Sequence, residues 1–201
     1  PENVMGEDAA RTLLAAQGLP SVTQDYLLGK LAAERTVFSW DCAVAILRPA
    51  MVSGASDHNR RIDYILSRFT GAGPGAVAAN DDEPFQLLWV EDLVRAMAGL
   101  LDAGTAKAVF NVAPPEKVSR TLLGRWVREA CPHGGSGDGS GAWNEDPFAP
   151  AVPGFFDSSA LRVAFPAFRF TGAADWVKQA ALEIAAGRSS RMETWEVAPR
   201  P

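Results

Sequence analysis

The chain has 201 residues, of which 47% are hydrophobic, and its formal net charge at pH 7 is -5. This length and apolar content suit one domain, or one large part of a domain, with a buried core, and the acidic balance excludes a basic nucleic-acid surface. Neither an apolar run long enough to span a bilayer nor a signal-peptide pattern is present, so we expect a soluble, cytoplasmic protein with no membrane partner.

The first half of the chain is predicted to alternate helices with apolar strands. A short helix is expected from Ala9 to Gln17 and a longer one from Gln24 to Trp40, with Ser21 and Thr23 as candidate N-caps. CAVAILRP, residues Cys42 to Pro49, is a continuous apolar run ended by proline. Such a run is typical of a strand that is buried on both faces of a parallel sheet.

The second half continues this alternation. Helix followed by buried strand predicts an α/β fold with right-handed crossovers and a largely parallel sheet. Residues 132–154 are rich in Gly, Ser and Pro and predict a mobile surface loop. The remaining expected elements are a helix from Asn59 to Phe69, a strand from Phe85 to Val90, a helix from Glu91 that Gly104 ends, a strand from Ala108 to Ala113, a helix capped by Ser119, a short segment from Asp157 to Arg162 and a helix from Ala173 to Ala186.

Several familiar motifs fail on context. Residues 71–76 (GAGPGA) and 137–142 have the spacing of a dinucleotide-binding turn, but neither follows a buried strand and opens a helix, so both are interpreted as loop glycines. His58 and His133 have no second ligand at metal-binding spacing, and the two cysteines form no CxxC pair. We therefore predict no metal site and no disulfide framework.

The segment QDYLLGKLAAE places Tyr26 and Lys30 four residues apart, on one face of a predicted helix. A nearby ammonium stabilises a phenolate, and a tyrosine tuned in this way can exchange a proton with a substrate oxygen while a hydride moves at the adjacent carbon. Taken alone, the pair is more typical of an aromatic and an amphipathic lysine on an ordinary helix surface than of a catalytic site.

Four segments in chain order give the pair a setting: DYLLGKLAAE, AILRPAMVSG, QLLWVEDLVRAM and VFNVAPPEKVSRTLLGRWV. They resemble the Y-x-x-x-K helix, the following Arg-Pro-x-x-Val-x-Gly strand, the H-V-x-D-L-A-x-A unit and the N-V segment of the extended short-chain dehydrogenase/reductases, the NAD-dependent epimerase/dehydratase-like branch. The resemblance implies that Tyr26 is the catalytic acid/base and that Lys30 holds the nicotinamide ribose and tunes Tyr26. It also implies that Pro49 and Ala50 border the nicotinamide ring.

The same resemblance implies that only the C-terminal part of the family fold is present. The family begins with a strand, a G-x-x-G-x-x-G turn and a helix, and it has a catalytic Ser or Thr shortly before the Tyr; none of these is found here. We therefore expect a partial Rossmann-like doubly wound parallel sheet plus a C-terminal substrate-binding portion. Residues 1–53 would end the Rossmann-like part, residues 54–187 would mix strand–helix units with the substrate-binding portion, and residues 188–201 would form a tail.

A partner follows from this expectation. NAD or NADP would bind only together with a complementing chain that carries the dinucleotide-binding half. That chain would also complete the sheet, because an open edge of apolar parallel strands is an aggregation hazard.

The predicted substrate side is apolar. Family members that act on sugar nucleotides often carry Asn where Met51 stands and Arg where Phe85 stands. Met51, Phe85 and Trp89 instead suggest a pocket for a hydroxyl or carbonyl group on a less charged metabolite. Each of the three is equally compatible with core packing. Three arginines stay open as alternative phosphate ligands: Arg60, Arg61 and Arg68.

The resulting functional hypothesis is the C-terminal part or subunit of an NAD(P)-dependent oxidoreductase or epimerase that acts on a hydroxyl or carbonyl substrate. Two alternatives stay open: a non-catalytic subunit that has lost cofactor binding, and a thioester-reductase-type domain. The sequence does not choose between NAD and NADP, nor does it name the substrate or the direction of reaction.

Overall fold

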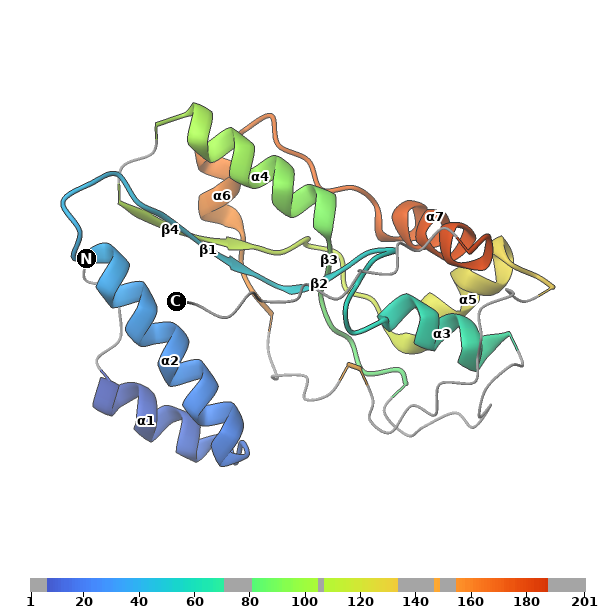
Figure 1. Cartoon of the computed structure of the whole chain (residues 1–201), viewed down its shortest axis with the longest axis horizontal. Helices are drawn as coiled ribbons and strands as arrows, with labels where there is room; N and C mark the ends of the chain where they lie inside the picture. Colours follow the sequence, from blue (N-terminus) through green and yellow to red (C-terminus); the bar gives the residue numbers. More distant parts are fainter. Residues whose placement is uncertain (1–6, 71–80, 105–106, 134–146, 149–154, 188–201) are drawn as a thin grey trace, which may run out of the picture. The chain divides into compact units, whose positions relative to one another are not determined.

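The computed structural model describes residues 7–70, 81–104, 107–133, 147–148 and 155–187 (Figure 1). The chain divides into two compact units, residues 1–46 with 100–109 and residues 47–99 with 110–201. The helices are α1 (Glu7–Ala16), α2 (Ser21–Phe38), α3 (Arg61–Phe69), α4 (Val90–Asp102), α5 (Arg120–Ala130), α6 (Ser159–Ala164) and α7 (Ala173–Ala185), and the strands are β1 (Ala45–Pro49), β2 (Met51–Ser53), β3 (Leu87–Trp89) and β4 (Ala108–Val112).

The strands form two parallel pairs, which confirms the predicted α/β class. Strand β2 runs parallel to β3, with Met51 opposite Leu87 and Ser53 opposite Trp89. Strand β1 pairs with β4. The backbone bonds that flank this second pair run from Ala108 N to the Val44 oxygen (2.9 Å) and from Ala50 N to the Val112 oxygen (3.0 Å), so both strands advance in the same direction.

In the first unit, α1 and α2 pack against each other, and Leu28 is the buried residue of α2. Helix α2 begins directly after Pro20, an extended residue (φ -55°, ψ 145°) that makes no side-chain cap bond. The predicted caps Ser21 and Thr23 lie inside the helix, so that prediction was wrong. Proline fixes φ, and it can end an extended segment before a helix without any side-chain acceptor.

Strand β1 is less buried than its sequence predicted. Its two end residues, Ala45 and Pro49, are exposed, and the three between them are half-buried. An apolar run ended by proline therefore marked a strand correctly, but the expected burial on both faces is not found in the part of the chain that the structure describes. The strand also begins later than expected, at Ala45 rather than at Cys42.

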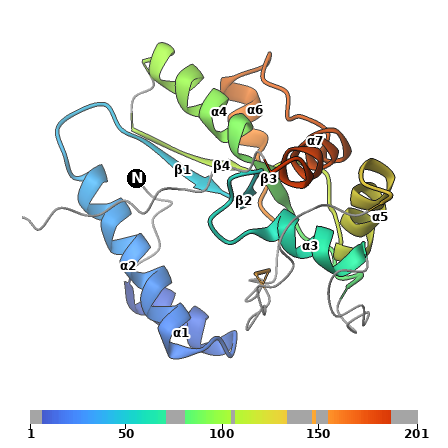
Figure 2. The same ribbon diagram turned by 45° about the vertical axis from the view of Figure 1, so that its right-hand side comes forward.

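The core of the second unit lies between three helices and strand β3. Helices α3, α5 and α7 pack on one another, and α7 packs on β3 (Figure 2). The Cα of Gly124 on α5 lies so close to Phe69 that an added Cβ would stand 2.4 Å from its ring. Ser119 caps α5 as predicted, because its Oγ accepts from Leu122 N at 3.2 Å. The largest fully buried side chains of this core are Ile62, Ile65, Leu87, Val118, Leu123, Val127, Phe148, Trp176 and Val177.

Two sets of buried polar side chains, the Arg68–Asp81 pair and Gln86, tie separate segments of the second unit together. Arg68 at the end of α3 makes two bonds to Asp81, of 2.9 and 2.7 Å, with side chains only 7% and 1% exposed. Gln86 donates from Nε2 to the oxygens of Pro114 and Phe156, and its Oε1 accepts from Phe156 N. The second set of bonds holds the chain before α6 against the segments that flank β3 and β4.

Some sequence predictions fall outside the described residues. These are the tail (residues 188–201), both glycine-rich motifs and most of the loop at residues 132–154. The division at residues 53/54 and 187/188 stays a prediction. Among the helices in the described ranges, none is long and apolar enough to cross a membrane.

Candidate functional site

The predicted pair Tyr26 and Lys30 lies on the surface of α2. The Lys30 Nζ stands 5.3 Å from the centroid of the Tyr26 ring, within the range of a cation–π contact. Tyr26 is 62% exposed. The helix therefore brings the ammonium beside the ring, as the spacing predicted, and leaves the phenol accessible to a ligand.

The two residues predicted to border the nicotinamide lie at the junction of β1 and β2. Pro49 ends β1 and is exposed, whereas Ala50 is buried and donates its N–H to the Val112 oxygen. Both belong to the second unit, whereas Tyr26 and Lys30 belong to the first. Within each unit, the members of the predicted site are neighbours.

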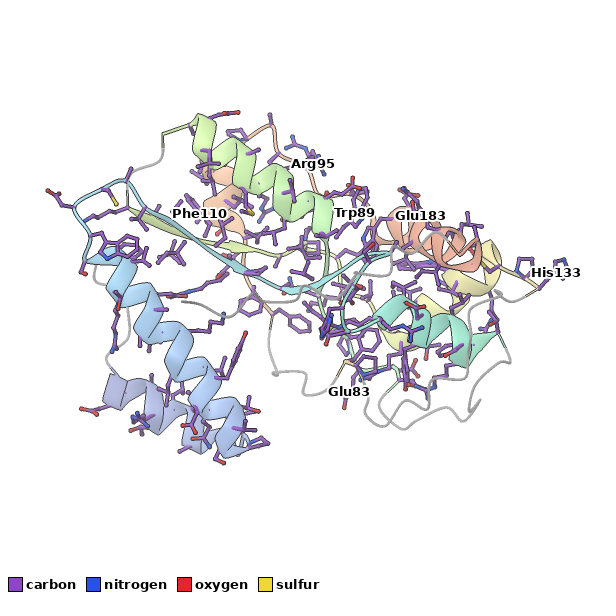
Figure 3. The ribbon with its side chains drawn as sticks, in the orientation of Figure 1. Glu83, Trp89, Arg95, Phe110, His133 and Glu183 are labelled. Atoms are coloured by element: carbon purple, nitrogen blue, oxygen red, sulfur yellow. The ribbon has the colours of Figure 1, made fainter. Side chains whose placement is uncertain are left out.

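The three residues predicted to contact substrate are half-buried and pack against the hydrophobic core of the second unit. Met51 and Trp89 lie on the adjacent strands β2 and β3, and Figure 3 shows Trp89 where β3 passes into α4. Phe85 precedes β3; its ring centroid lies 5.3 Å from that of Phe148. These contacts give all three a packing role, and their substrate role stays a prediction.

A cavity that sequence analysis missed lies at the carboxyl ends of β2 and β3. Its volume is about 430 Å³, and its lining comes from the end of β2, the loop before α3 and the first residue of α4. The residues that matter here are Val52, Ser53, Asp57, His58, Asn59 and Val90. His58 is exposed, as predicted, but it faces a hollow rather than a flat surface.

One wall of this cavity is a hydrogen-bond network centred on Asp57. Its carboxylate accepts from Ser53 Oγ (3.0 Å), Asn59 N (2.9 Å) and Arg61 Nη1 (2.9 Å). Arg61 also donates from Nη1 to the Val52 oxygen and from Nε to the Pro147 oxygen. Because the side chains of Asp57 and Arg61 are only 6% and 13% exposed, the network is a preorganised wall. The i, i+4 spacing of Asp57 and Arg61 was the one visible signal for it.

The three arginines considered as phosphate ligands are each paired with a carboxylate. Arg61 is held by Asp57, Arg68 by Asp81 and Arg60 by Asp63 at 3.3 Å. A guanidinium engaged by a carboxylate has a smaller net attraction for a phosphate. The structure therefore does not support the use of these three arginines as a diphosphate clamp.

A second cavity, of about 460 Å³, lies between the chain that follows β4 and the chain that precedes α7. Two charged residues of its lining are used by the fold itself: Glu116 Oε2 accepts from Ala173 N (3.0 Å), and Arg169 Nη1 donates to backbone oxygens of its own loop. Across the described residues, no three His, Cys, Asp or Glu side chains gather in a way that could hold a metal ion.

Comparison with known sequences gives one family match and one kind of curated relative. The model of the NAD dependent epimerase/dehydratase family matches residues 4–113. The dTDP-4-dehydrorhamnose reductase of Mycobacterium tuberculosis, in strains H37Rv and CDC 1551, is 33% identical over 107 residues, which are 53% of this chain and 34% of the relative. The chain thus spans about a third of the length of the curated relatives it matches.

Comparison with solved structures confirms the fold over about 80% of the chain. RMD from Pseudomonas aeruginosa, complexed with NADPH, has a TM-score of 0.56 at 19% identity and covers 83% of this chain and 56% of its own. WbmF of Bordetella bronchiseptica, in complex with NADH, has a TM-score of 0.59 at 14% identity and covers 80% and 52%.

The family match corrects one prediction from the sequence. We expected only the C-terminal part of the family fold, without the dinucleotide-binding half. The match instead starts at residue 4 and covers the N-terminal, dinucleotide-binding part, so that expectation was wrong. It rested on a missing glycine turn and a missing Ser/Thr strand, and a motif of a few residues does not measure how much of a fold is present.

Proposed function

Because this chain belongs to the NAD dependent epimerase/dehydratase family, we propose that it acts as an NAD(P)-dependent oxidoreductase or epimerase on a hydroxyl or carbonyl substrate. The observation that carries the proposal is the contact between Lys30 and the exposed ring of Tyr26 on α2. An accessible phenol beside an ammonium is the arrangement that proton exchange with a substrate oxygen requires.

In the proposed mechanism, NAD(P) supplies or accepts the hydride. The Tyr26 hydroxyl gives a proton to the substrate oxygen, or takes one from it, and Lys30, whose Nζ lies 5.3 Å from the centroid of the Tyr26 ring, would hold the nicotinamide ribose. Pro49 and Ala50 would border the nicotinamide ring of a bound cofactor. The backbone bond from Ala50 N to the Val112 oxygen holds that border in place.

The substrate side of the proposal rests on apolar residues. Met51, Phe85 and Trp89 provide half-buried surface near the ends of two parallel strands. The similarity to a dTDP-4-dehydrorhamnose reductase supports reduction of a carbonyl as the direction to test first. The complementing chain predicted from the sequence stays a prediction. The dinucleotide-binding part is matched in this chain, so it no longer supports a partner. The remaining support is the exposure of strand β1.

The test combines cofactor binding with a matched pair of tyrosine variants. NADH and NADPH are titrated by fluorescence, and turnover is followed with a panel of carbonyl substrates. Tyr26→Phe should lower kcat by about 10²- to 10⁴-fold and leave cofactor affinity nearly unchanged. The chain's other tyrosine, Tyr64, accepts a hydrogen bond from Arg68 within the second unit, so Tyr64→Phe is the control and should retain turnover.

Two results would reject the proposal. If neither cofactor binds, the chain is a non-catalytic family member and Tyr26 has no chemical role. If turnover is present but Tyr26→Phe and Tyr64→Phe retain it equally, a different residue transfers the proton.

A further inference from the structure

The cavity beside β2 occupies the position at which parallel sheets bind ligands. Strand β2 ends at Ser53 and the parallel strand β3 ends opposite it at Trp89, with α4 beginning at the next residue, Val90. Ligands of open α/β sheets bind in the crevice outside the carboxyl ends of the strands. The volume of about 430 Å³ lies within the range of about 300–1,000 Å³ that is usual for small-molecule sites.

The polar groups of this cavity are mostly neutral. Ser53 contributes a hydroxyl and His58 an imidazole, and Asn59 contributes an amide. With its oxygen assigned toward the Arg61 guanidinium (3.1 and 3.2 Å), the Asn59 amide keeps its two N–H groups as donors. Such a set suits hydroxyl groups, which both donate and accept.

The charges in the cavity cancel. Asp57 and Arg61 form one buried pair, and Arg61 also donates to the Val52 and Pro147 oxygens and to the Asn59 oxygen. The first turn of α4 already carries Glu91 and Asp92, which compensate the positive end of its dipole. An incoming phosphate would therefore meet a carboxylate and an occupied guanidinium, whereas phosphate binding needs free bidentate donors.

We infer that this cavity binds the neutral, hydroxyl-bearing part of the substrate and that the Asp57–Arg61 pair excludes phosphorylated groups from it. This inference rests on the proposed function, since it names the substrate class of the same enzyme. His58 and Asn59 are the specificity-determining residues, and Asp57 is a positioning residue that acts through Arg61.

The test measures binding to the full chain, without cofactor and without turnover. The probes are methyl α-D-glucopyranoside, a neutral polyol, and thymidine diphosphate, an anion; both are followed by saturation-transfer NMR and by amide shifts of residues 53–61. The neutral probe should shift these amides. His58→Ala and Asn59→Ala should each weaken it about three- to tenfold, as expected for one lost hydrogen bond. Both side chains are exposed, so neither substitution disturbs the core.

A control and a gain-of-function variant sharpen the result. His133, labelled in Figure 3 beyond the end of α5, is the chain's other histidine and is exposed, so His133→Ala should leave binding unchanged. Asp57→Asn keeps the shape of the side chain but removes its negative charge, so the positive charge of Arg61 is no longer cancelled within the cavity. It should bring thymidine diphosphate binding at these amides, with affinity for the neutral probe kept within about threefold.

The inference is overturned if the neutral probe does not bind, if His58→Ala and Asn59→Ala bind it as wild type does, or if thymidine diphosphate shifts the same amides of the wild-type chain. It is also overturned if Asp57→Asn, folded by its amide spectrum, gains no anion binding. These signals are measured without cofactor and without turnover, so they do not depend on the proton transfer assigned to Tyr26. Failure of the cavity and failure of the proposed chemistry are therefore separate outcomes.

Discussion

Replacing Asp81 by Asn should destabilise the chain more than any single exposed charge change. Asp81 and Arg68 form a two-bonded pair whose side chains are 1% and 7% exposed. Asp81→Asn preserves the volume of the side chain but leaves the guanidinium buried without its counter-charge. Removing one partner of such a pair costs about 3–5 kcal/mol of unfolding free energy, because the stranded charge stays desolvated.

The assay is urea unfolding followed by circular dichroism, compared with two further variants. Arg68→Met with Asp81→Leu removes both charges and refills the space with apolar atoms, so it should cost far less than Asp81→Asn alone. Arg60→Met, at the N-cap of the same helix α3, is the matched control: the Arg60 side chain is 48% exposed and pairs with Asp63 at 3.3 Å. An exposed pair of this kind contributes only about 0–1 kcal/mol.

A loss of less than about 1 kcal/mol of unfolding free energy in Asp81→Asn would refute this prediction, since a buried guanidinium without its counter-charge is strongly destabilising. It is also refuted if the apolar double variant is as unstable as Asp81→Asn. In that case shape, and not charge, would set the contribution of this site.

Three further predictions concern single residues. Ellman's reagent should label the exposed Cys42 at once, but Cys131 only on unfolding, because burial covers its thiol and raises its pKa; equal labelling rates would contradict this. Gly124→Ala puts a methyl group 2.4 Å from the phenyl ring at the end of α3 and should lower stability in urea by about 1–3 kcal/mol, and an unchanged midpoint would refute it. Hydrogen bonds from Ser159 lower the pKa of Asp157. The contribution of Asp157 to stability is therefore present above the pKa of the unfolded state and is lost as pH falls through the pKa of the folded state. Asp157→Asn should make Tm depend less on pH in the acid range, and an unchanged dependence would show that the bonds are absent.

Local signals in the sequence were enough for most of the elements. Ser119 was predicted as a cap because its oxygen needs only the N–H three residues on, and the structure has that bond. The strand–helix unit around Trp89 was predicted from a short apolar run followed at once by helical periodicity. Both signals lie within a few residues of the feature that they specify, which is why they succeeded.

The wall of the cavity was not predictable in the same way. The pairing of Asp57 with Arg61 is local, but the contact that fixes Arg61 in place reaches Pro147, 86 residues further along the chain. The residues near Arg61 in the sequence do not indicate that it contacts a residue so far along the chain. Residues such as Met51 raise a different difficulty, since an apolar side chain suits a substrate pocket and a protein core equally well.

The extent of family membership was misjudged for a related reason. The glycine turn and the Ser/Thr strand are compact signals, and their absence was taken to mean that a whole half of the fold is missing. A family model weighs every position, and it found the match from residue 4 to residue 113. Likeness spread thinly over many residues carries information that a search for motifs does not use.

Helix α2 has 18 residues, and Leu28 is the one that it buries. Because α2 packs on α1 but buries a single side chain, its amide hydrogens should exchange by local opening at a free energy below that of global unfolding. Binding of a ligand to Tyr26 and Lys30 would have to offset the conformational entropy that is lost when this helix is kept folded. Slowed amide exchange along residues 21–38 would then report occupancy directly, before any turnover is seen, and would separate true ligands from compounds that bind elsewhere.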